Sequence, residues 1–432
     1  MTGAMGATAV AFALAVGSGG ASRPSFDDLI ANLKSPNAKT RQEAAAALGN
    51  SRRREAVAHL AALVRDPEPK VRLEVVRALG QLRDLSAVPA VVTSLQDGDP
   101  RMREEAVGVL VELYAERERT TPVGRFLEVF SDEYDRSSVP PYTPVDPSVY
   151  RALATVLADE EEGIREQAAL ALGILDGGAV VKDLVTALHD PEASVRAAAA
   201  TAIGKVGTAE DGKALIPLLE DDSSSGRNRV LQALGVLRVK EAGPRLRELY
   251  EANRRKESGM RILACLSRIG DPGQGDLFRE LVQDPDPEKK RLAVEGLGRI
   301  SDASMLPAFK KDFQRERNEE LRLAYNFALT LLGDRAFLDS IVLNLPSRTL
   351  GTRCRSYILE MGREIAPELY FYLNEADADV RAEVCDLLAV LGDADAIPRL
   401  VPLINDTNPK VADRANRAVE RLRRSRGGSP AR

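Results

Sequence analysis

Apolar residues recur at helical spacing along most of the chain, in short segments that are separated by polar turns. The segment 87–96, AVPAVVTSLQ, places apolar side chains at i, i+3, i+4 and i+7 from Val88, which is one face of a helix. The segment 69–82, which follows a polar turn, places Val71, Val75 and Leu79 along one face of a second helix. Each unit therefore predicts two helices. A proline in the first turn opens several first helices, where its missing N–H costs nothing: Pro89, Pro244, Pro307, Pro367 and Pro398.

The two-helix unit returns with a period of about 31 residues, which can be followed through one arginine of the second helix. This repeat arginine falls at Arg41, Arg72, Arg103, Arg165, Arg196, Arg227, Arg261, Arg291, Arg322, Arg353 and Arg381, with Ala412 in the last place. A fixed period in this range indicates a solenoid, in which each helical pair buries its apolar face against its neighbours. The interval from Arg103 to Arg165 is twice the usual one, so we expect one degenerate repeat there.

The turn before each second helix carries an acidic residue six positions ahead of the arginine. An acidic side chain there can accept hydrogen bonds from free N–H groups of the turn or of the helix start. This position is occupied by Asp66, Asp97, Asp159, Asp190, Asp221 and Asp406. Gly-Asp pairs at 270–271, 333–334 and 392–393 predict a tight turn at the end of the second helix.

These motifs resemble the HEAT repeat, in the short bacterial form that is also found in phycobilisome-lyase-like proteins. Asp66-Pro67, Val71-Arg72 and Ala78-Leu79-Gly80 match one copy, and Asp190-Pro191, Val195-Arg196 and Ala202-Ile203-Gly204 match another. The resemblance covers roughly residues 26–424. It implies an all-α, right-handed, armadillo-like solenoid of about twelve helical pairs plus the one degenerate repeat. It does not imply an activity, because such repeats serve many functions.

The resemblance also implies a structural role for the turn residues and the repeat arginines, as a ladder of hydrogen bonds between neighbouring repeats. The alternative is a row of arginines that binds a ligand. The ladder set is Asp66, Arg72, Asp97, Arg103, Asp159, Arg165, Asp190 and Arg196.

Composition and charge narrow the possible functions further. The formal net charge of -5 and the absence of Trp argue against a general nucleic-acid-binding face, which needs a strongly basic surface. Three cysteines, Cys265, Cys354 and Cys385, form no disulfide framework, so we interpret them as buried thiols. His59 and His189 lack the partners of a catalytic or di-iron site, and no zinc spacing or phosphate loop is present. We therefore expect a protein that is not an enzyme and holds no metal or cofactor.

The first 25 residues do not belong to the repeat. Residues 4–16 are apolar and small, and the Gly- and Ser-rich segment 17–22 follows, as in an export signal, although no basic residue precedes the apolar run. The run is too short to span a bilayer. Export to the periplasm is favoured over a cytoplasmic location with a loose N-terminal tail. The chain then divides into repeats (26–119), the degenerate repeat (120–150), further repeats (151–424) and a basic tail (425–432).

The degenerate repeat carries most of the unusual chemistry of this sequence. Residues 132–147 contain four prolines, which exclude a regular second helix, and aromatic residues gather around them. A long Pro- and Tyr-rich loop either fills the gap left by a missing helix or contacts a partner. The candidate contact residues here are Phe126, Phe130, Tyr134 and Tyr142.

The second helices of a HEAT-like stack line its concave face, and positions two and five after the repeat arginine are expected to point outward there. These positions are mixed in charge, which favours a protein or peptide partner over a polyanion. They are Glu74, Arg77, Glu105, Arg229, Gln232, Phe327, Arg355, Glu383 and Asp386. The sequence thus favours a scaffold or adaptor for protein–protein interaction. The alternatives are a bilin-lyase-like or other enzyme-accessory protein and a periplasmic envelope adaptor.

Overall fold

The computed structural model describes residues 24–114 and 145–427, and these residues form a stack of antiparallel helical pairs. The 24 α-helices make twelve repeats of two helices each, and the described residues contain no strand. The all-α solenoid predicted from the sequence is therefore confirmed. The predicted export signal, the loop residues Phe126, Phe130, Tyr134 and Tyr142, and the last residues of the basic tail lie outside the described residues.

The second helices stack side by side and form the most continuous layer of the molecule. They are α2 (Ala38–Asn50), α4 (Pro69–Leu82), α6 (Pro100–Tyr114), α8 (Glu162–Ile174), α10 (Ala193–Val206), α12 (Ser224–Leu237), α14 (Glu257–Ile269), α16 (Pro287–Arg299), α18 (Glu319–Leu331), α20 (Gly351–Met361), α22 (Ala378–Val390) and α24 (Pro409–Gly427).

The first helices are shorter, and several are completed by a 3₁₀ turn. They are α1 (Phe26–Asn32), α3 (Ala56–Ala61), α5 (Val88–Ser94), α7 (Pro147–Val156), α9 (Val181–Ala187), α11 (Ala209–Gly212) with η5 (Lys213–Glu220), α13 (Gly243–Asn253), α15 (Gly275–Leu281), α17 (Leu306–Arg315), α19 (Leu338–Leu343), α21 (Ala366–Leu369) with η11 (Tyr370–Asn374), and α23 (Ile397–Leu400) with η13 (Val401–Asn405). Short 3₁₀ turns also precede many of the first helices: η1 (Leu85–Ala87), η4 (Gly178–Val180), η6 (Lys240–Ala242), η7 (Pro272–Gln274), η8 (Ala303–Met305), η9 (Arg335–Phe337), η10 (Arg363–Ile365) and η12 (Ala394–Ala396).

Glycines of the second helices allow neighbouring helices to approach closely. A Cβ built on Gly173 of α8 would lie 2.9 Å from the Cα of Ala202 in α10, and one on Gly298 of α16 would lie 2.8 Å from the Cα of Ala328. At the ends of the second helices, Gly270, Gly333 and Gly392 adopt positive φ, as the Gly-Asp pairs predict. Gly173 and Gly298 are therefore required for close contact between helices, and the glycines at the helix ends are required for their backbone conformation.

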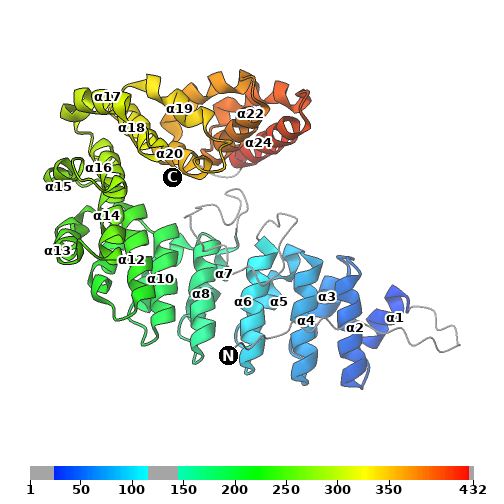
Figure 1. The fold of residues 1–432 in the computed structure, drawn as a ribbon. Helices are drawn as coiled ribbons and strands as arrows, with labels where there is room; N and C mark the ends of the chain where they lie inside the picture. The colour runs from blue at the N-terminus through cyan, green and yellow to red at the C-terminus, as the bar shows by residue number, and fades with distance from the viewer. Residues whose placement is uncertain (1–23, 115–144, 428–432) are drawn as a thin grey trace, which may run out of the picture.

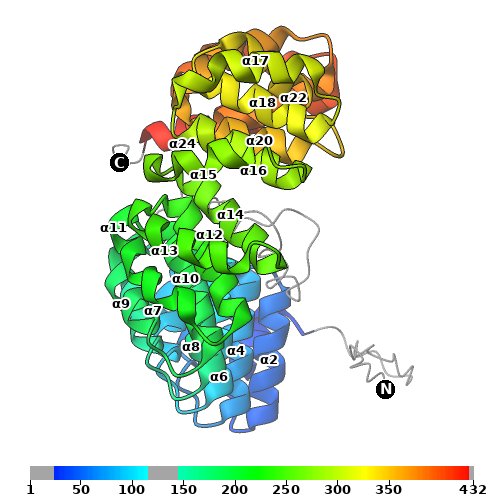
Figure 2. The same ribbon diagram turned by 60° about the vertical axis from the view of Figure 1, so that its left-hand side comes forward.

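The stack bends sharply in its second half. In Figure 1 the repeats from α2 to α12 form one arm, the chain turns through α13–α16, and the repeats from α17 to α24 fold back above it. Figure 2 shows the same two arms joined at the turn by α14, α15 and α16. Arg238, at the end of α12, bonds to Glu360 of α20 across 122 residues of sequence. Second helices of distant repeats meet in this way only on the inner side of a bend, so they line the concave face.

The core divides near the bend. One continuous apolar cluster runs from Leu33 to Leu329, and a second runs from Leu323 to Leu422. Helix α18 contributes to both clusters, because Ala324 packs into the first and Phe327 into the second. The bend therefore coincides with a change from one core to the next.

The described repeats on either side of residues 115–144 are bonded directly to each other. Arg103 of α6 donates hydrogen bonds to Asp159, at 2.6 and 2.7 Å, although 56 residues separate them instead of the usual 25. The repeats of α6 and α8 are therefore direct neighbours. Residues 120–144 of the predicted degenerate repeat lie outside the described residues, so that repeat stays a prediction, and within its predicted bounds Pro147 opens helix α7 with Asp146 as its N-cap.

Candidate interaction surface

The repeat arginines and the turn aspartates form pairs along one edge of the stack. Arg72 donates from Nε and Nη2 to the carboxylate of Asp97 in the next repeat, at 2.7 and 2.8 Å, and from Nη1 to the carbonyl oxygen of Asp66, at 2.9 Å. Each aspartate also accepts a backbone N–H two residues later, such as that of Glu68 on Asp66. The same bidentate pairing joins Arg41 to Asp66, Arg103 to Asp159, Arg165 to Asp190, Arg196 to Asp221 and Arg381 to Asp406.

These pairs occupy the groups that a ligand-binding arginine row would offer. In each pair Nε and Nη2 meet a carboxylate, and Nη1 meets a carbonyl, so the guanidinium fork has protein acceptors on both sides. Hydrogen bonds from Arg103 hold the pKa of Asp159 below its usual value, and those from Arg196 do the same for Asp221. The geometry therefore makes this edge a structural ladder, and a partner surface has to be sought elsewhere.

The predicted concave residues lie on the second helices, and most of them pair with one another. Arg77 of α4 donates to Oε2 of Glu105 in α6 at 3.0 Å, and beside them Glu74 is half-buried. Burial raises the pKa of Glu74, and the charge of Glu105 adds to that rise. The other predicted residues form the contacts Arg229–Gln232, Arg355–Glu383 and Asp386–Arg414. The inner face is thus polar, with charges of both signs.

Phe327 does not belong to this surface, contrary to the sequence-based prediction. Its side chain is fully buried, and its ring stacks on Tyr357 of α20 with centroids 4.0 Å apart and planes 13° apart. The guanidinium of Arg299 lies over the ring of Phe327, 5.1 Å from its centroid. The prediction is wrong because α18 lies at the bend, where α20 covers the position that faces solvent in a straighter stack.

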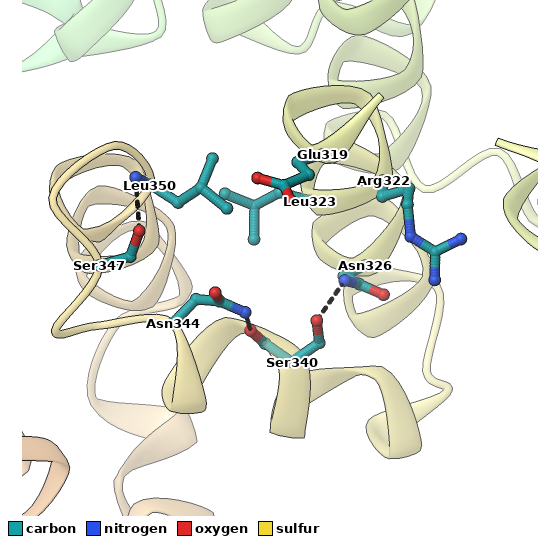
Figure 3. A pocket seen from close by; sticks show the side chains of 8 residues that line it. All are labelled: Glu319, Arg322, Leu323, Asn326, Ser340, Asn344, Ser347 and Leu350. Atoms are coloured by element: carbon teal, nitrogen blue, oxygen red, sulfur yellow. Dashed lines mark hydrogen bonds between the residues drawn. The ribbon is translucent and has the colours of Figure 1, made fainter. Parts of the chain in front are cut away.

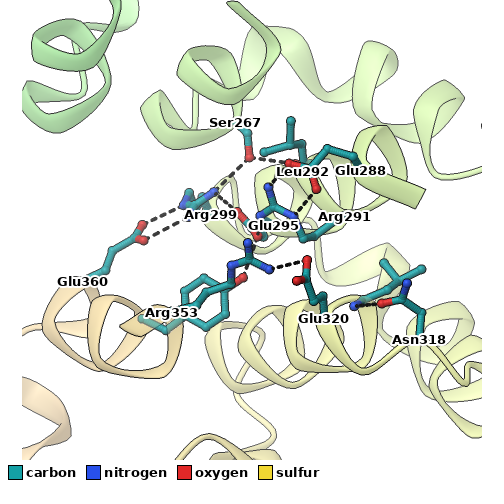
Figure 4. A network of polar contacts seen from close by, with 12 residues as sticks. Ser267, Glu288, Arg291, Leu292, Glu295, Arg299, Asn318, Glu320, Arg353 and Glu360 are labelled. Carbon is teal, nitrogen blue, oxygen red and sulfur yellow. Dashed lines mark hydrogen bonds and ion pairs between the residues drawn. The ribbon is translucent and has the colours of Figure 1, made fainter. Parts of the chain in front are cut away.

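A buried ionic network at the bend was not predicted from the sequence (Figure 4). Arg299 of α16 donates to both carboxylate oxygens of Glu360 in α20, at 2.7 and 3.0 Å, and Arg238 of α12 reaches Oε1 of Glu360 at 2.9 Å. The hydroxyl of Tyr357 donates to Oε1 of Glu295 at 2.5 Å. We call Arg238, Glu295, Arg299, Tyr357 and Glu360 the bend cluster.

The carboxylates of the bend cluster are charged despite their burial. Burial alone would raise the pKa of Glu360, but the charge of Arg299 and its hydrogen bonds outweigh burial, so the pKa falls below its usual value. The same balance lowers the pKa of Glu295, where Arg291 and Arg299 supply the positive charge. Buried charges cost little only when each one is paired, as here. The cluster therefore ties three non-adjacent repeats together.

The bidentate ladder pairs run from Arg41 to Arg196 and return at Arg381; between them, beyond the bend, a polar cavity opens between α18, α19 and the loop that leads into α20 (Figure 3). Ser347 stands 25 residues after Arg322, in the place where other repeats have the ladder aspartate. Asn326, only 2% exposed, donates to Oγ of Ser340 at 2.8 Å, and its Oδ1 accepts no hydrogen bond from the described residues. The cavity has a volume of about 180 Å³. Its hydroxyl and amide lining suits polar groups more than an apolar ligand.

The residues that commonly perform catalysis are poorly placed for it in the described part of the chain. His59 and His189 are exposed and lie in different repeats. Cys265, Cys354 and Cys385 are free and buried, and burial raises the pKa of each thiol to about 12. Within residues 24–114 and 145–427, no group of three His, Cys, Asp or Glu residues has a metal-binding arrangement. Among the described helices, none has both the length and the hydropathy to cross a bilayer.

Comparison with known proteins agrees with the geometry of the repeats. The family model for HEAT repeats matches residues 26–111, 150–235 and 181–259, on both sides of residues 115–144, which lie outside the described residues. The chain therefore carries HEAT repeats over these matched ranges.

Solved structures with which the chain can be aligned are distant. An engineered protein from a structural genomics consortium is 17% identical, with 92% of this chain and 98% of that chain covered and a TM-score of 0.38. The complex of CpcE and CpcF of phycocyanin lyase from Nostoc sp. is 21% identical, with 65% and 96% covered and a TM-score of 0.30. The comparison with curated proteins found no match.

Proposed function

We propose that the chain is a non-enzymatic scaffold that binds a protein or peptide partner along the inner face of its second helices. The observation that carries the proposal is the bend itself: arginines at the ends of α12 and α16 bond to Glu360 of α20, so the second helices of the two arms face each other on the inner side of the bend. This face carries charges of both signs, such as Glu74, Arg77 and Glu105, and such mixed surfaces suit specific protein contacts.

Two further observations support a binding role over a catalytic one. The thiols are buried and protonated, and the histidines are exposed and isolated, so the described residues hold no ready nucleophile with its base. The carboxylates of the bend cluster bond to other residues of the cluster, as in a structural network. On the strength of the sequence alone, we extend the proposal to the aromatic residues Phe126, Phe130, Tyr134 and Tyr142 as a second contact region.

Charge reversal on the inner face tests the proposal. The double variant Glu74→Lys and Glu105→Lys changes the inner face, and Asp183→Lys on the outer helix α9 is the control, since Asp183 is exposed and forms no ion pair with any of the described residues. Affinity purification with quantitative mass spectrometry should show partners that are retained by wild type and control and lost by the double variant. Equal partner sets for all three proteins would contradict binding through the inner face.

A further inference from the structure

The outer face of the last three repeats carries a row of exposed apolar side chains. Phe371 is 75% exposed, Leu343 is 48% exposed and Val401 is 39% exposed, and each lies on the first helix of its own repeat, in η11, α19 and η13. Of the large apolar side chains in the described part of the chain, only Leu85, far away in the turn that opens the third repeat, is comparably exposed. We call Leu343, Phe371 and Val401 the outer stripe.

Two residues of the outer stripe share one position of the repeat, and the third lies next to it. Leu343 and Phe371 stand ten residues before Arg353 and Arg381, whereas Val401 stands eleven before Ala412, beside the exposed Pro402. In the earlier repeats the shared position holds small, polar or charged residues, a proline or one buried leucine: Ala31, Ala62, Thr93, Thr155, Thr186, Pro217, Glu251, Leu281 and Asp312. Among the described repeats, a large exposed apolar side chain at or beside this position therefore occurs only in the last three, which are consecutive.

The side chain of Phe371 is exposed, and the residue before it, Tyr370, carries a cation on its ring. The ring of Phe371 meets Tyr372 edge-on, with centroids 5.6 Å apart, and Tyr372 is buried and bonds to Asp339. Arg399, on the first helix of the last repeat, lies 4.2 Å from the ring centroid of Tyr370. No carboxylate of the described residues forms an ion pair with Arg399, so this exposed guanidinium has no anionic partner within the described part of the chain.

We propose that the outer stripe binds an amphipathic helix of a partner protein, laid across the first helices of the last three repeats. Packed helices lie about 8–10 Å apart, and seven residues of a helix rise about 10 Å. A partner helix with apolar residues every seven positions would therefore place one of them against each of Leu343, Phe371 and Val401. An acidic residue on the flank of that helix would pair with Arg399.

The size of the stripe favours a single helix over a second copy of the chain. Three helices span roughly 25–30 Å, and one helix is about 10–12 Å wide, so the strip offers roughly 300 Å². A stable dimer needs about 800 Å² from each partner. The stripe lies on the outer face, so this inference is independent of the proposed binding on the inner face.

A displayed library of 22-residue helical peptides, panned on the full chain, tests the proposal. We expect enriched peptides with apolar residues at seven-residue intervals and an acidic flank. In fluorescence anisotropy the best peptide should bind Phe371→Asp at least tenfold more weakly than wild type. Leu85→Asp is the matched control, because Leu85 is as exposed as Leu343 but lies outside the stripe, and it should bind as wild type does. Circular dichroism will establish that both variants are folded.

Three results would overturn the proposal. Peptides that bind Phe371→Asp as well as wild type would place the docking site elsewhere, and a library without enriched peptides would mean that the stripe does not accept a helix. Sedimentation of the wild-type chain as a dimer that Phe371→Asp converts to a monomer would assign the stripe to a second copy.

Discussion

At the scale of single residues, one buried position explains why this stack is not uniform. The residue four after the repeat arginine is buried from the first repeat to the eleventh, and in the second to fifth repeats it is Val76, Val107, Ala169 and Ala200. In the eighth, ninth and tenth repeats it is Glu295, Asn326 and Tyr357. Polar groups at this position must find partners inside the structure: Tyr357 and Glu295 bond to each other across the bend, and Asn326 bonds to Ser340 of the next repeat.

The close approach of α8 and α10 predicts opposite effects for two glycine substitutions. Gly173→Ala should destabilise the protein by about 1–3 kcal/mol, because the new Cβ would lie 2.9 Å from backbone Cα of Ala202. Gly108→Ala, in the interior of α6 with no atom within 4 Å of its Cβ, should stabilise by about 0.5–1 kcal/mol. Urea unfolding of the two variants and wild type measures both effects. Equal changes of the same sign would show that the helices are not in contact at Gly173.

The ladder aspartates predict a loss of stability in acid. Because Arg103 lowers the pKa of Asp159 in the folded state, this pair stabilises the fold fully above the unfolded pKa of about 3.9, and the contribution is lost as pH falls through the lower folded value. Free energies of unfolding, measured by urea from pH 7 to pH 3, should fall below about pH 4 for wild type. Asp159→Asn should be less stable at pH 7 and show a shallower fall. A variant curve parallel to that of wild type would exclude this pair as a source of the acid sensitivity.

At the scale of helices and repeats, the sequence predicted well what depends on local chemistry. The period, the two helices of each repeat, the proline at the start of first helices and the glycine at the end of second helices all follow from contacts within about one repeat, and the structure contains them. The unusual role of Glu295 could also have been inferred, since it is a charged residue at a repeat position that is apolar in most other repeats.

The bend could not be read from the same pattern, because its partners are distant in sequence. Arg238 and Glu360 are 122 residues apart, and neither departs from ordinary surface chemistry when viewed within its own repeat. The burial of Phe327 follows from that bend and was missed with it. The direct bond between Arg103 and Asp159, across the doubled interval, could not be read from the period either.

The direct contact between the third and fourth repeats predicts that the intervening segment can be removed. Helices α4 and α5 are joined by five residues, and deletion of residues 116–142 would leave five residues between α6 and α7. The melting temperature should change by only a few degrees, because the ladder bond and the N-cap Asp146 are retained. Circular dichroism melting of the deletion variant measures this. A large loss of stability would show that the removed residues support the stack.

At the scale of the whole molecule, the bend cluster determines how far the two arms close on each other. Packing between consecutive repeats leaves the angle of each step adjustable, and small changes in that angle accumulate along a solenoid. Contacts between repeats that are not neighbours remove this freedom. Glu360 accepts hydrogen bonds from Arg299 of α16 and from Arg238 at the end of α12. A single carboxylate therefore fixes the total angle between α12 and α20, which are four repeats apart.

Neutralising Glu360 should therefore open the molecule. Glu360→Gln keeps the shape of the side chain but leaves the buried guanidinium of Arg299 with Glu295 as its remaining anionic partner, at a cost of up to about 3–5 kcal/mol. Small-angle X-ray scattering should show a larger radius of gyration than that of wild type. Arg238→Gln, at a half-exposed position, removes only the link to the long arm and should produce part of this opening with little loss of stability. Glu364→Gln, four residues further on, is exposed and serves as the control. If Glu360→Gln is folded and its scattering curve matches that of wild type and control, the packing of neighbouring repeats alone sets the bend.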